Sequence, residues 1–265
     1  MNLSIVVTGR NDNYDGDFND RLSLAINRNL KSLPDAEFIF VEWNPYMDRP
    51  LVCEELQKIF KDRIKYYAVH PKFHEAYCTF DEFNEYPAKN VGIRRAKGKF
   101  IACVNSDIIF DPQLVENLRR VSETNIVYRA SRIDIRPDYK YVRFPLLPKF
   151  ILGRYTGPTD ACGDFTMTDR DTWVRFTGYC EEFPEQRLHK DSLMVHLFTS
   201  DGLPIRMIGS ATHWRHPSSW ANGFRRPKVG DTKWDFRKSG YKRNKFTWGL
   251  ANADEVERNG IIWLE

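Results

Sequence analysis

The chain has 265 residues, of which 42% are hydrophobic and 14% aromatic, and its formal net charge is +4 at pH 7. This composition excludes a disordered chain, and the length suits one large domain or a domain with a small appendage. No apolar run approaches the roughly 20 residues that span a bilayer, and the first residues are too uncharged for a signal peptide, so we expect a soluble cytoplasmic protein.

The first half of the chain alternates predicted strands and helices. The apolar patterns predict strands over 3–8, 36–43, 63–69, 100–104 and 126–128, and helices over 18–30, 51–60 and 89–97. Strands separated by helices of this length form right-handed βαβ units. We therefore predict the α/β class, with a Rossmann-like, mainly parallel central sheet flanked by helices.

The segment 89–110, KNVGIRRAKGKFIACVNSDIIF, is the most informative part of the chain. Its helix is expected to end at Gly98 after a basic last turn, and the strand that follows has no polar alternation, as in strands covered on both faces. This strand delivers Asn105 and Asp107 to its carboxyl edge, where open α/β sheets bind ligands. The alternative is that these side chains only cap the next turn, but the other motifs favour a site.

The second half of the chain is less regular. Prolines interrupt it at 137, 145, 148 and 158, helices are expected over 169–176 and 191–200, and a strand over 204–209. No repeat or linker divides the chain, which predicts a single domain. The cysteines are odd in number and form no C-x-x-C pair, which favours reduced core thiols over disulfides; they are Cys53, Cys78, Cys103, Cys162 and Cys180.

Three polar clusters are candidates for chemistry. The loop at 9–13 could hydrogen-bond a base or ribose, with an ordinary turn as the alternative, and it lacks the G-x-G-x-x-G and G-K-[ST] patterns of dinucleotide sites and P-loops. Asn105 and Asp107 offer hard oxygen ligands that suit Mg²⁺ or Mn²⁺ carrying a diphosphate. His213 and His216 could place an imidazole on the same metal, the alternative being hydrogen-bonded or surface histidines.

These motifs in this order resemble glycosyltransferases of the GT-A fold, close to the inverting family 2 enzymes. The resemblance is to bacterial and viral GT-A-like proteins with V-G-R-N-D, A-K-N-x-G-I-R-R-A-x-G, N-x-D, G-D-F and H-x-x-H-x-S-x-W motifs. The matching residues are 7–12, 88–98, 105–107, 163–165 and 213–220. The resemblance implies a metal-dependent, inverting hexosyl- or pentosyltransferase that uses Mn²⁺ or Mg²⁺ and moves a sugar from a nucleotide-sugar donor to a hydroxyl of a glycan or glycolipid.

The same resemblance divides the domain and assigns the donor site. Residues 1–130 would bind the nucleotide sugar and 131–212 the acceptor, and 213–265 would form a basic aromatic C-terminal segment. Arg10 and Asp12 would contact the nucleotide. The implied metal ligands are Asp107 and His213, with His216 as a substitute. Asn105 stands where the usual motif has an aspartate, so it would face the ribose or a metal-bound water, and the metal is expected to bind weakly without nucleotide.

The implied catalytic base is Asp191, because segments 178–182 and 189–192 resemble G-G-[FY]-D-E followed by E-D. An inverting transfer needs such a group to take the proton of the acceptor hydroxyl. A plain helix N-cap is the alternative role for Asp191, and both roles are compatible. Asp164 is the second candidate for the base, and we assign it with Gly163, Arg95 and Trp220 to substrate binding. For Arg95 a solvated helix face is the alternative.

The tail at 214–248 carries ten lysines and arginines against two aspartates. A lid over the diphosphate, a patch for an anionic membrane or lipid-linked acceptor, and a nucleic-acid surface all fit this composition. No nucleic-acid motif accompanies it, so we expect a lid that also binds the acceptor, with peripheral contact to the cytoplasmic face of a membrane. Two other functions stay open. A sugar-phosphate nucleotidyltransferase would carry a G-x-G-T-R-type loop after the first strand, and a non-catalytic carbohydrate- or nucleic-acid-binding module would have a degenerate site.

Overall fold

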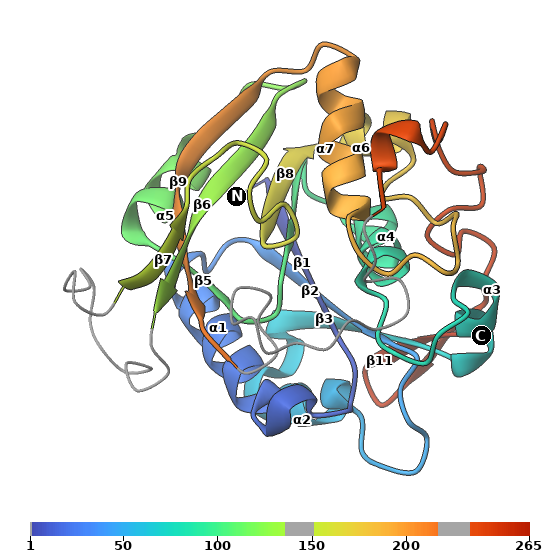
Figure 1. Ribbon diagram of the computed structural model, residues 1–265. Coiled ribbons are helices and arrows are strands. Elements are labelled where there is room, and N and C mark those ends of the chain that lie inside the picture. The colour runs from blue at the N-terminus through green and yellow to red at the C-terminus, as the bar shows by residue number, and fades with distance from the viewer. Residues whose placement is uncertain (1, 136–150, 217–233) are drawn as a thin grey trace.

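The computed structural model describes residues 2–135, 151–216 and 234–265, in which one central sheet is covered by helices on both faces (Figure 1). Eleven strands form the sheet in the order β10-β11-β3-β2-β1-β4-β8-β6-β9-β5, with β7 beside β6. The strands are β1 (Leu3–Gly9), β2 (Glu37–Trp43), β3 (Ile64–Val69), β4 (Phe100–Val104), β5 (Ile108–Phe110), β6 (Val127–Ile135), β7 (Ile151–Tyr155), β8 (Phe165–Asp169), β9 (Ile205–Trp214), β10 (Glu255–Arg258) and β11 (Ile261–Leu264). The α-helices are α1 (Phe18–Ser32), α2 (Val52–Phe60), α3 (His74–Tyr77), α4 (Glu85–Arg95), α5 (Pro112–Arg120), α6 (Arg170–Phe176) and α7 (Lys190–Ser200). Short 3₁₀ turns include η1 (Tyr14–Gly16), η2 (Lys61–Arg63), η3 (Pro71–Phe73) and η7 (Phe236–Lys238).

Five neighbouring strands, β11, β3, β2, β1 and β4, run parallel to one another. The chain crosses from β3 back over the sheet to β4, so the strand order reverses between β1 and β4. In open α/β sheets the carboxyl ends of the strands beside such a reversal form the ligand-binding crevice. Every residue of β1 and β4 is buried, as expected for strands covered on both faces. The predicted α/β class is therefore confirmed.

Beyond β4 the sheet becomes mixed. Strand β8 is antiparallel to β4 and β6, β9 is parallel to β6, and β5 is antiparallel to β9. The strands predicted over 126–128 and 204–209 extend further, to Ile135 and Trp214. The pattern at 108–110 predicted no strand, yet β5 places Ile108 opposite His213. Because β5 begins directly after Asp107, this pairing brings residue 107 beside the end of β9.

Helix α4 differs from its prediction at both ends. It begins at Glu85, where the Asn84 side chain accepts a hydrogen bond from the backbone N–H of Tyr86, and it ends at Arg95 with Ala96 as C-cap. Gly98 is therefore not the residue that ends the helix. Its backbone N–H donates to Ser4 Oγ at 2.8 Å, and a Cβ at Gly98 would lie 2.6 Å from the Ser4 nitrogen. The glycine instead allows the start of β4 to approach β1 closely.

The C-terminal residues form a hairpin that the sequence reading did not predict. Strands β10 and β11 are antiparallel and are joined through Asn259 and Gly260, which have φ values of 53° and 75°. An Asn-Gly pair with positive φ at both positions is the preferred two-residue hairpin turn. Strand β11 then pairs with β3 and extends the parallel half of the sheet.

Two apolar layers hold the helices to the sheet. Residues of α1, α2 and α5 pack on one face and residues of α4, α6 and α7 on the other (Figure 1). All five cysteines are buried and unpaired, as predicted. Within the described ranges, no helix combines the length and apolar character needed to cross a membrane.

Gly92 marks the closest approach of α4 to β1, and enlarging it is expected to destabilise the fold. A Cβ at Gly92 would lie 2.4 Å from Cγ1 of the fully buried Val6. We expect Gly92→Ala to lower the free energy of unfolding by about 1–3 kcal/mol, the usual cost of overpacking, measured by urea denaturation. Val6→Ala alone should also destabilise, but the double variant should lose less than the sum of the two losses. Additive losses would show that the two residues do not clash.

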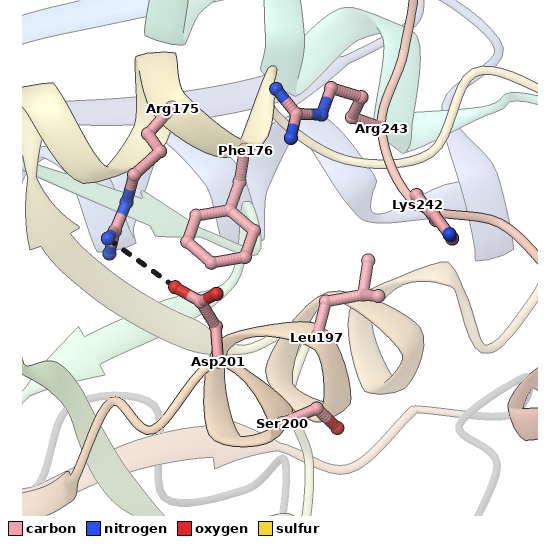
Figure 2. Close-up of a pocket in the computed structure, with 7 residues that line it drawn as sticks. All are labelled: Arg175, Phe176, Leu197, Ser200, Asp201, Lys242 and Arg243. Atoms are coloured by element: carbon pink, nitrogen blue, oxygen red, sulfur yellow. Dashed lines mark ion pairs between the residues drawn. The ribbon is translucent and has the colours of Figure 1, made fainter.

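A pocket of about 340 Å³ opens beside the C-terminal ends of α6 and α7 (Figure 2). It therefore lies at the opposite end of α7 from the first turn of that helix. Its lining combines the basic side chains of Arg175, Lys242 and Arg243 with the apolar Phe176 and Leu197, and Arg175 pairs with Asp201 at 3.4 Å. This pocket is distinct from the crevice at the carboxyl ends of β1 and β4.

Candidate functional site

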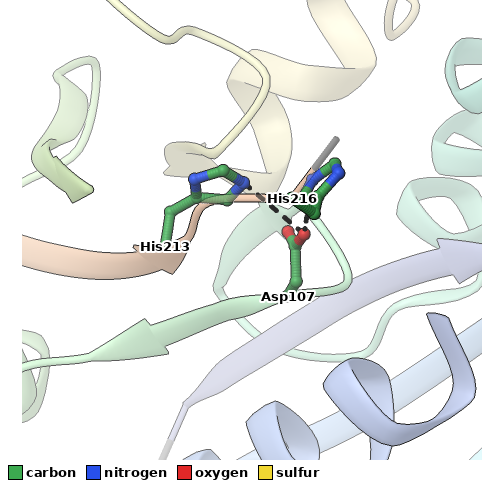
Figure 3. A group of neighbouring side chains, drawn as sticks. All are labelled: Asp107, His213 and His216. Atoms are coloured by element: carbon green, nitrogen blue, oxygen red, sulfur yellow. Dashed lines mark ion pairs between the residues drawn. The ribbon is translucent and has the colours of Figure 1, made fainter. Parts of the chain in front are cut away.

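Three side chains from distant parts of the chain converge at the carboxyl end of β4 (Figure 3). Asp107 lies in the link between β4 and β5, His213 lies in β9, and His216 follows β9. The Asp107 carboxylate oxygen Oδ2 is 3.5 Å from His213 Nε2 and 3.3 Å from His216 Nε2. All three side chains are buried, and one ligand atom from each lies within 4.8 Å of the others. The structure thus brings together the three residues that the resemblance assigned to the metal.

Both histidines are held from behind by a second carboxylate. His213 Nδ1 lies 3.0 Å from Asp134 Oδ1, and His216 Nδ1 lies 2.7 Å from Asp15 Oδ2. These contacts turn both Nε2 atoms toward Asp107. Metal-binding histidines in proteins are typically oriented by such a carboxylate on the other ring nitrogen. The donor set of two imidazoles and one carboxylate therefore fits a divalent transition metal.

The charges in this cluster stabilise one another. Burial alone would lower the pKa of His213, but the carboxylates of Asp107 and Asp134 raise it to about 9. Burial would likewise raise the pKa of Asp107, yet the two histidines hold it well below its usual range. The pKa of Asp134 is about 2, because hydrogen bonds from His213 and Arg132 outweigh the effect of its burial. A divalent cation bound here would replace the proton on His213, since only neutral imidazole binds metal.

Arg21 adds a buried positive charge beside the metal ligands. Its side chain is 2% exposed, and its Nε lies 3.6 Å from Asp107 Oδ2. Within the described part of the chain this Nε has no hydrogen-bond partner. Arg21 Nη1 also pairs with Asp17, so this guanidinium is held between two carboxylates beside the metal ligands.

A second cluster surrounds Asn105. Its amide Nδ2 donates to Asp164 Oδ1 at 2.9 Å, and its Oδ1 accepts from Lys89 Nζ at 2.8 Å. An aspartate at 105 would place its carboxylate directly against that of Asp164, and two carboxylates in contact cannot both stay ionised without cost. The structure therefore gives a physical reason for asparagine at this position.

Lys89 is the buried centre of this second cluster. Its side chain is fully buried, and its ammonium group contacts Glu85 Oε2 at 2.5 Å and the Gly163 carbonyl oxygen at 3.0 Å. Burial raises the pKa of Glu85, and the charge of Lys89 opposes that rise. Lys89 thus fixes Asn105 relative to the 163–164 segment.

Arg132 joins the two clusters. Its Nη1 contacts Asp164 Oδ2 at 3.1 Å, while its Nε contacts Asp134 Oδ1 at 2.6 Å. Asp134 in turn orients His213. A continuous chain of ion pairs therefore runs from His213 through Asp134 and Arg132 to Asp164, and a hydrogen bond continues it to Asn105.

Asp191 lies beside this second cluster, in the first turn of α7. The N-cap of α7 is His189, so the alternative of a plain N-cap role for Asp191 is wrong. Its carboxylate accepts a hydrogen bond from the Tyr86 hydroxyl at 3.3 Å. A Cβ on Gly163 would lie 3.2 Å from Asp191 Oδ2 and 3.5 Å from Asn105 Nδ2, so these three residues are neighbours. Burial and the nearby carboxylates hold the pKa of Tyr86 well above its usual range, so its hydroxyl keeps the proton that it donates.

The loop after β1 contributes to the same edge of the sheet. Arg10 pairs with Asp12 through Nη2 at 2.8 Å and Nε at 3.0 Å, and its guanidinium lies 4.7 Å from the centre of the Tyr46 ring. The Asn11 side chain ties this loop to the loop after β2 through the Tyr46 carbonyl at 2.9 Å. The following turn carries Asp15, which holds His216. The loop and the metal ligands therefore belong to one site.

One residue predicted to bind substrate, Arg95, is not part of this cluster. Arg95 lies where α4 leads into β4, at the opposite edge of the sheet from Asn105. Its guanidinium binds the carbonyl oxygens of Gly249 and Leu250 at 2.8 Å and 3.1 Å, so it fastens the C-terminal segment, and its substrate-binding role is not supported. Trp220 lies outside the described residues.

Sequence patterns did not identify the residues that hold the metal ligands and Asn105 in place. Lys89 lies within the A-K-N-x-G-I-R-R-A-x-G motif. Its role depends on buried contacts across three segments, and the residues next to it in sequence do not indicate such contacts. Asp134 was missed because the strand 126–128 was predicted too short; the alternation of polar and apolar residues over 132–135 continues it. Asp15 lies in a polar turn that resembles any other surface turn in sequence.

The fold is similar to that of two solved glycosyltransferases. The mannosyltransferase PcManGT from Pyrobaculum calidifontis, in complex with GDP-Man and Mn²⁺, is 9% identical with a TM-score of 0.50, over 83% of this chain and 58% of that chain. The TarS 1–349 structure from S. aureus, in complex with UDP-GlcNAc, is 12% identical with a TM-score of 0.51, over 88% of this chain and 62% of that chain. This chain thus matches about three fifths of each. No protein-family model matches the chain, and no curated protein sequence does. The likeness shows the fold, and the predicted GT-A fold is confirmed.

Proposed function

We propose that this protein is a metal-dependent, inverting glycosyltransferase that moves a sugar from a nucleotide-sugar donor to a hydroxyl of a glycan or glycolipid. The observation that carries the proposal is the convergence of Asp107, His213 and His216 at the point where the strand order reverses. The GT-A fold supports it, because two proteins with this fold were solved with nucleotide sugars.

Asp107, His213 and His216 are the residues that would hold the divalent cation. When bound, this ion would neutralise the charge that develops on the departing diphosphate. Arg21 would add a second positive charge from the protein itself, since its Nε lies 3.6 Å from Asp107 Oδ2. Two imidazoles among three ligands favour Mn²⁺ over Mg²⁺, because Mg²⁺ prefers an all-oxygen environment.

Asp191 would act as the base. In an inverting transfer the bond from the acceptor oxygen to the anomeric carbon forms as the bond to the diphosphate oxygen breaks, and the acceptor proton passes to a base. The Asp191 carboxylate is half-buried, is held by the Tyr86 hydroxyl and faces Gly163. The absence of a side chain at Gly163 leaves room beside this carboxylate for a sugar.

Binding of the donor is the first prediction of this proposal. A nucleoside diphosphate with Mn²⁺ should stabilise the protein by about 2.7 kcal/mol when present at 100 times its Kd, which thermal unfolding detects. The shift should be smaller with Mg²⁺ and vanish with a chelator, while the nucleoside without phosphates should give none. An equal shift with chelator present would contradict a metal-dependent donor site.

The same samples distinguish a glycosyltransferase from the two alternative functions, a non-catalytic binding module and a nucleotidyltransferase. Slow hydrolysis of a nucleotide sugar to sugar and nucleoside diphosphate would support the transferase, and metal-dependent binding without hydrolysis would favour a non-catalytic module. Pyrophosphate release from a nucleoside triphosphate and a sugar phosphate would indicate a nucleotidyltransferase. The division of the domain into donor and acceptor halves and the cytoplasmic location stay predictions.

A further inference from the structure

The segment 241–248, which we call the basic loop, displays three cations and a phenylalanine on the surface. Tyr241, Asn244 and Trp248 are buried and anchor it, whereas the residues between them are exposed: Lys242, Arg243, Lys245, Phe246 and Thr247. The loop is therefore held at three points, and the side chains between those points face outward.

Asn244 fixes the loop firmly to the body of the protein. Its Nδ2 donates to the carbonyl oxygens of Thr177 and Tyr179 at 2.7 Å and 2.6 Å, and its Oδ1 accepts from the Glu181 backbone N–H at 2.8 Å. All hydrogen-bonding capacity of this buried amide is directed inward. The exposed residues are thus presented on a fixed backbone, at little cost in ordering entropy on binding.

Phe246 is exposed far beyond what the fold requires. Its side chain is 84% exposed, the highest value among the large hydrophobic residues that the structure describes. The guanidinium of Arg94 lies 5.6 Å from the centre of its ring. A large apolar side chain held outward on an anchored loop among cations is typical of proteins that insert at a membrane interface.

The basic loop and the residues next to it in sequence carry charge of one sign. The sequence from 236 to 253 holds five lysines and arginines and no carboxylate. Lys242, Arg243 and Lys245 form no ion pair within the described part of the chain, whereas Arg237 and Lys238 both lie near Asp235. The three exposed cations of the basic loop are therefore available to an external anion.

A pocket of headgroup size adjoins the basic loop (Figure 2). Lys242, Arg243 and Arg175 line it together with the apolar side chains of Phe176 and Leu197. Its only carboxylate among the lining residues is Asp201, which is paired with Arg175. The pocket therefore combines a net positive charge with apolar lining residues, which suits a phosphate that carries an apolar group.

We propose that the basic loop and this pocket dock the protein onto an anionic lipid bilayer. Phe246 inserts at the boundary between headgroups and acyl chains, and Lys242, Arg243 and Lys245 lie against lipid phosphates. The charge complementarity selects this occupant over a protein surface, because each lysine or arginine near an anionic membrane contributes about 1 kcal/mol. This inference does not depend on the proposed reaction.

The chain supplies a matched control on helix α2. Ile59 is 60% exposed and is flanked by the exposed lysines Lys58 and Lys61, as Phe246 is flanked by cations. There, however, Glu54, Glu55 and Asp62 lie among the cations. The control variant Lys58→Ser/Ile59→Ser/Lys61→Ser therefore removes the same charge and one apolar side chain as Lys242→Ser/Lys245→Ser/Phe246→Ser.

The experiment is flotation of the full chain with phosphatidylcholine vesicles that contain or lack phosphatidylserine. We expect binding only to the anionic vesicles, weakened by salt. The basic-loop variant should lower the partition coefficient about thirtyfold or more, from two lysines at ~1 kcal/mol each, and the α2 variant should leave it unchanged.

Three results would overturn the proposal. The first is that the unmodified protein does not bind to anionic vesicles, and the second is that both variants lower the partition coefficient equally. The third is that the protein self-associates, that the basic-loop variant abolishes this self-association, and that neither form binds to vesicles. A cooperative thermal unfolding transition of each variant without ligand shows that each is folded, and the further shift with nucleoside diphosphate and Mn²⁺ is kept as a separate test of the donor site.

Discussion

Replacing Asp107 by asparagine is expected to abolish the stabilisation of this protein by nucleoside diphosphate and Mn²⁺. The Asp107 carboxylate faces both imidazoles, at 3.5 Å from His213 Nε2 and 3.3 Å from His216 Nε2. Asparagine keeps the shape but removes the negative charge that a divalent cation needs. Residues that only hold a metal ligand in place contribute about 10–100-fold to metal affinity, so loss of the ligand should exceed a hundredfold. Titration calorimetry of Mn²⁺ in the presence of nucleoside diphosphate measures it.

Substitutions of two other aspartates show how much of the loss of Mn²⁺ affinity is specific to Asp107. Asp134 only orients His213, at 3.0 Å from its Nδ1, so Asp134→Asn should weaken Mn²⁺ by about 10–100-fold. Asp35 is exposed and distant from the ligands in the fold, so Asp35→Asn controls for the loss of one negative charge. Unchanged Mn²⁺ affinity in Asp107→Asn, or a larger loss in Asp134→Asn, would show that the ligands are assigned wrongly.

The substitution Asp191→Asn is expected to reduce turnover by about 10²–10⁴, the usual contribution of a general base, and to leave donor binding nearly intact. The amide cannot accept the acceptor proton, but it can still accept the hydrogen bond from the Tyr86 hydroxyl. The local structure should therefore persist. Turnover is measured with saturating donor, and donor binding by the thermal shift with Mn²⁺.

Asp171 provides the matched control for Asp191. Both residues are the second residue of a helix, so both interact in the same way with the helix dipole. Asp171 is exposed, and α6 begins at the edge of the sheet opposite Asn105, because β8 is antiparallel to β4. Asp171→Asn should retain full turnover. If Asp191→Asn also did, another group would have to take the proton, and Asp164 would be tested next.

Local sequence patterns predicted most of the parallel part of the sheet. Strands β1 to β4 and the helices between them follow from apolar runs and helical periodicity, which depend only on residues close in sequence. The position of Asp107 at a carboxyl edge follows from the same patterns, because a buried strand ends immediately before it. The structure confirms these predictions with shifts of a few residues at the ends of α4.

Local sequence patterns could not predict which residues orient the metal ligands. The contacts of Asp134 with His213 and of Asp15 with His216 depend on how β6, β9 and η1 meet, and nothing in the neighbouring residues specifies that. Arg95 shows the same limit, since its observed partners, the carbonyl oxygens of Gly249 and Leu250, lie far along the chain. Contacts between distant segments decide both cases.

The pairing of β5 with β9 has a consequence for how the protein is made. Asp15 and His216, which touch across the site, are 201 positions apart in the chain. During synthesis the N-terminal strands emerge first and can begin to fold. His216 joins them only after the chain through residue 216 has left the ribosome. A nascent or truncated chain that ends before residue 213 therefore holds Asp107 without its imidazoles, and metal capture must wait until His213 and His216 are in place.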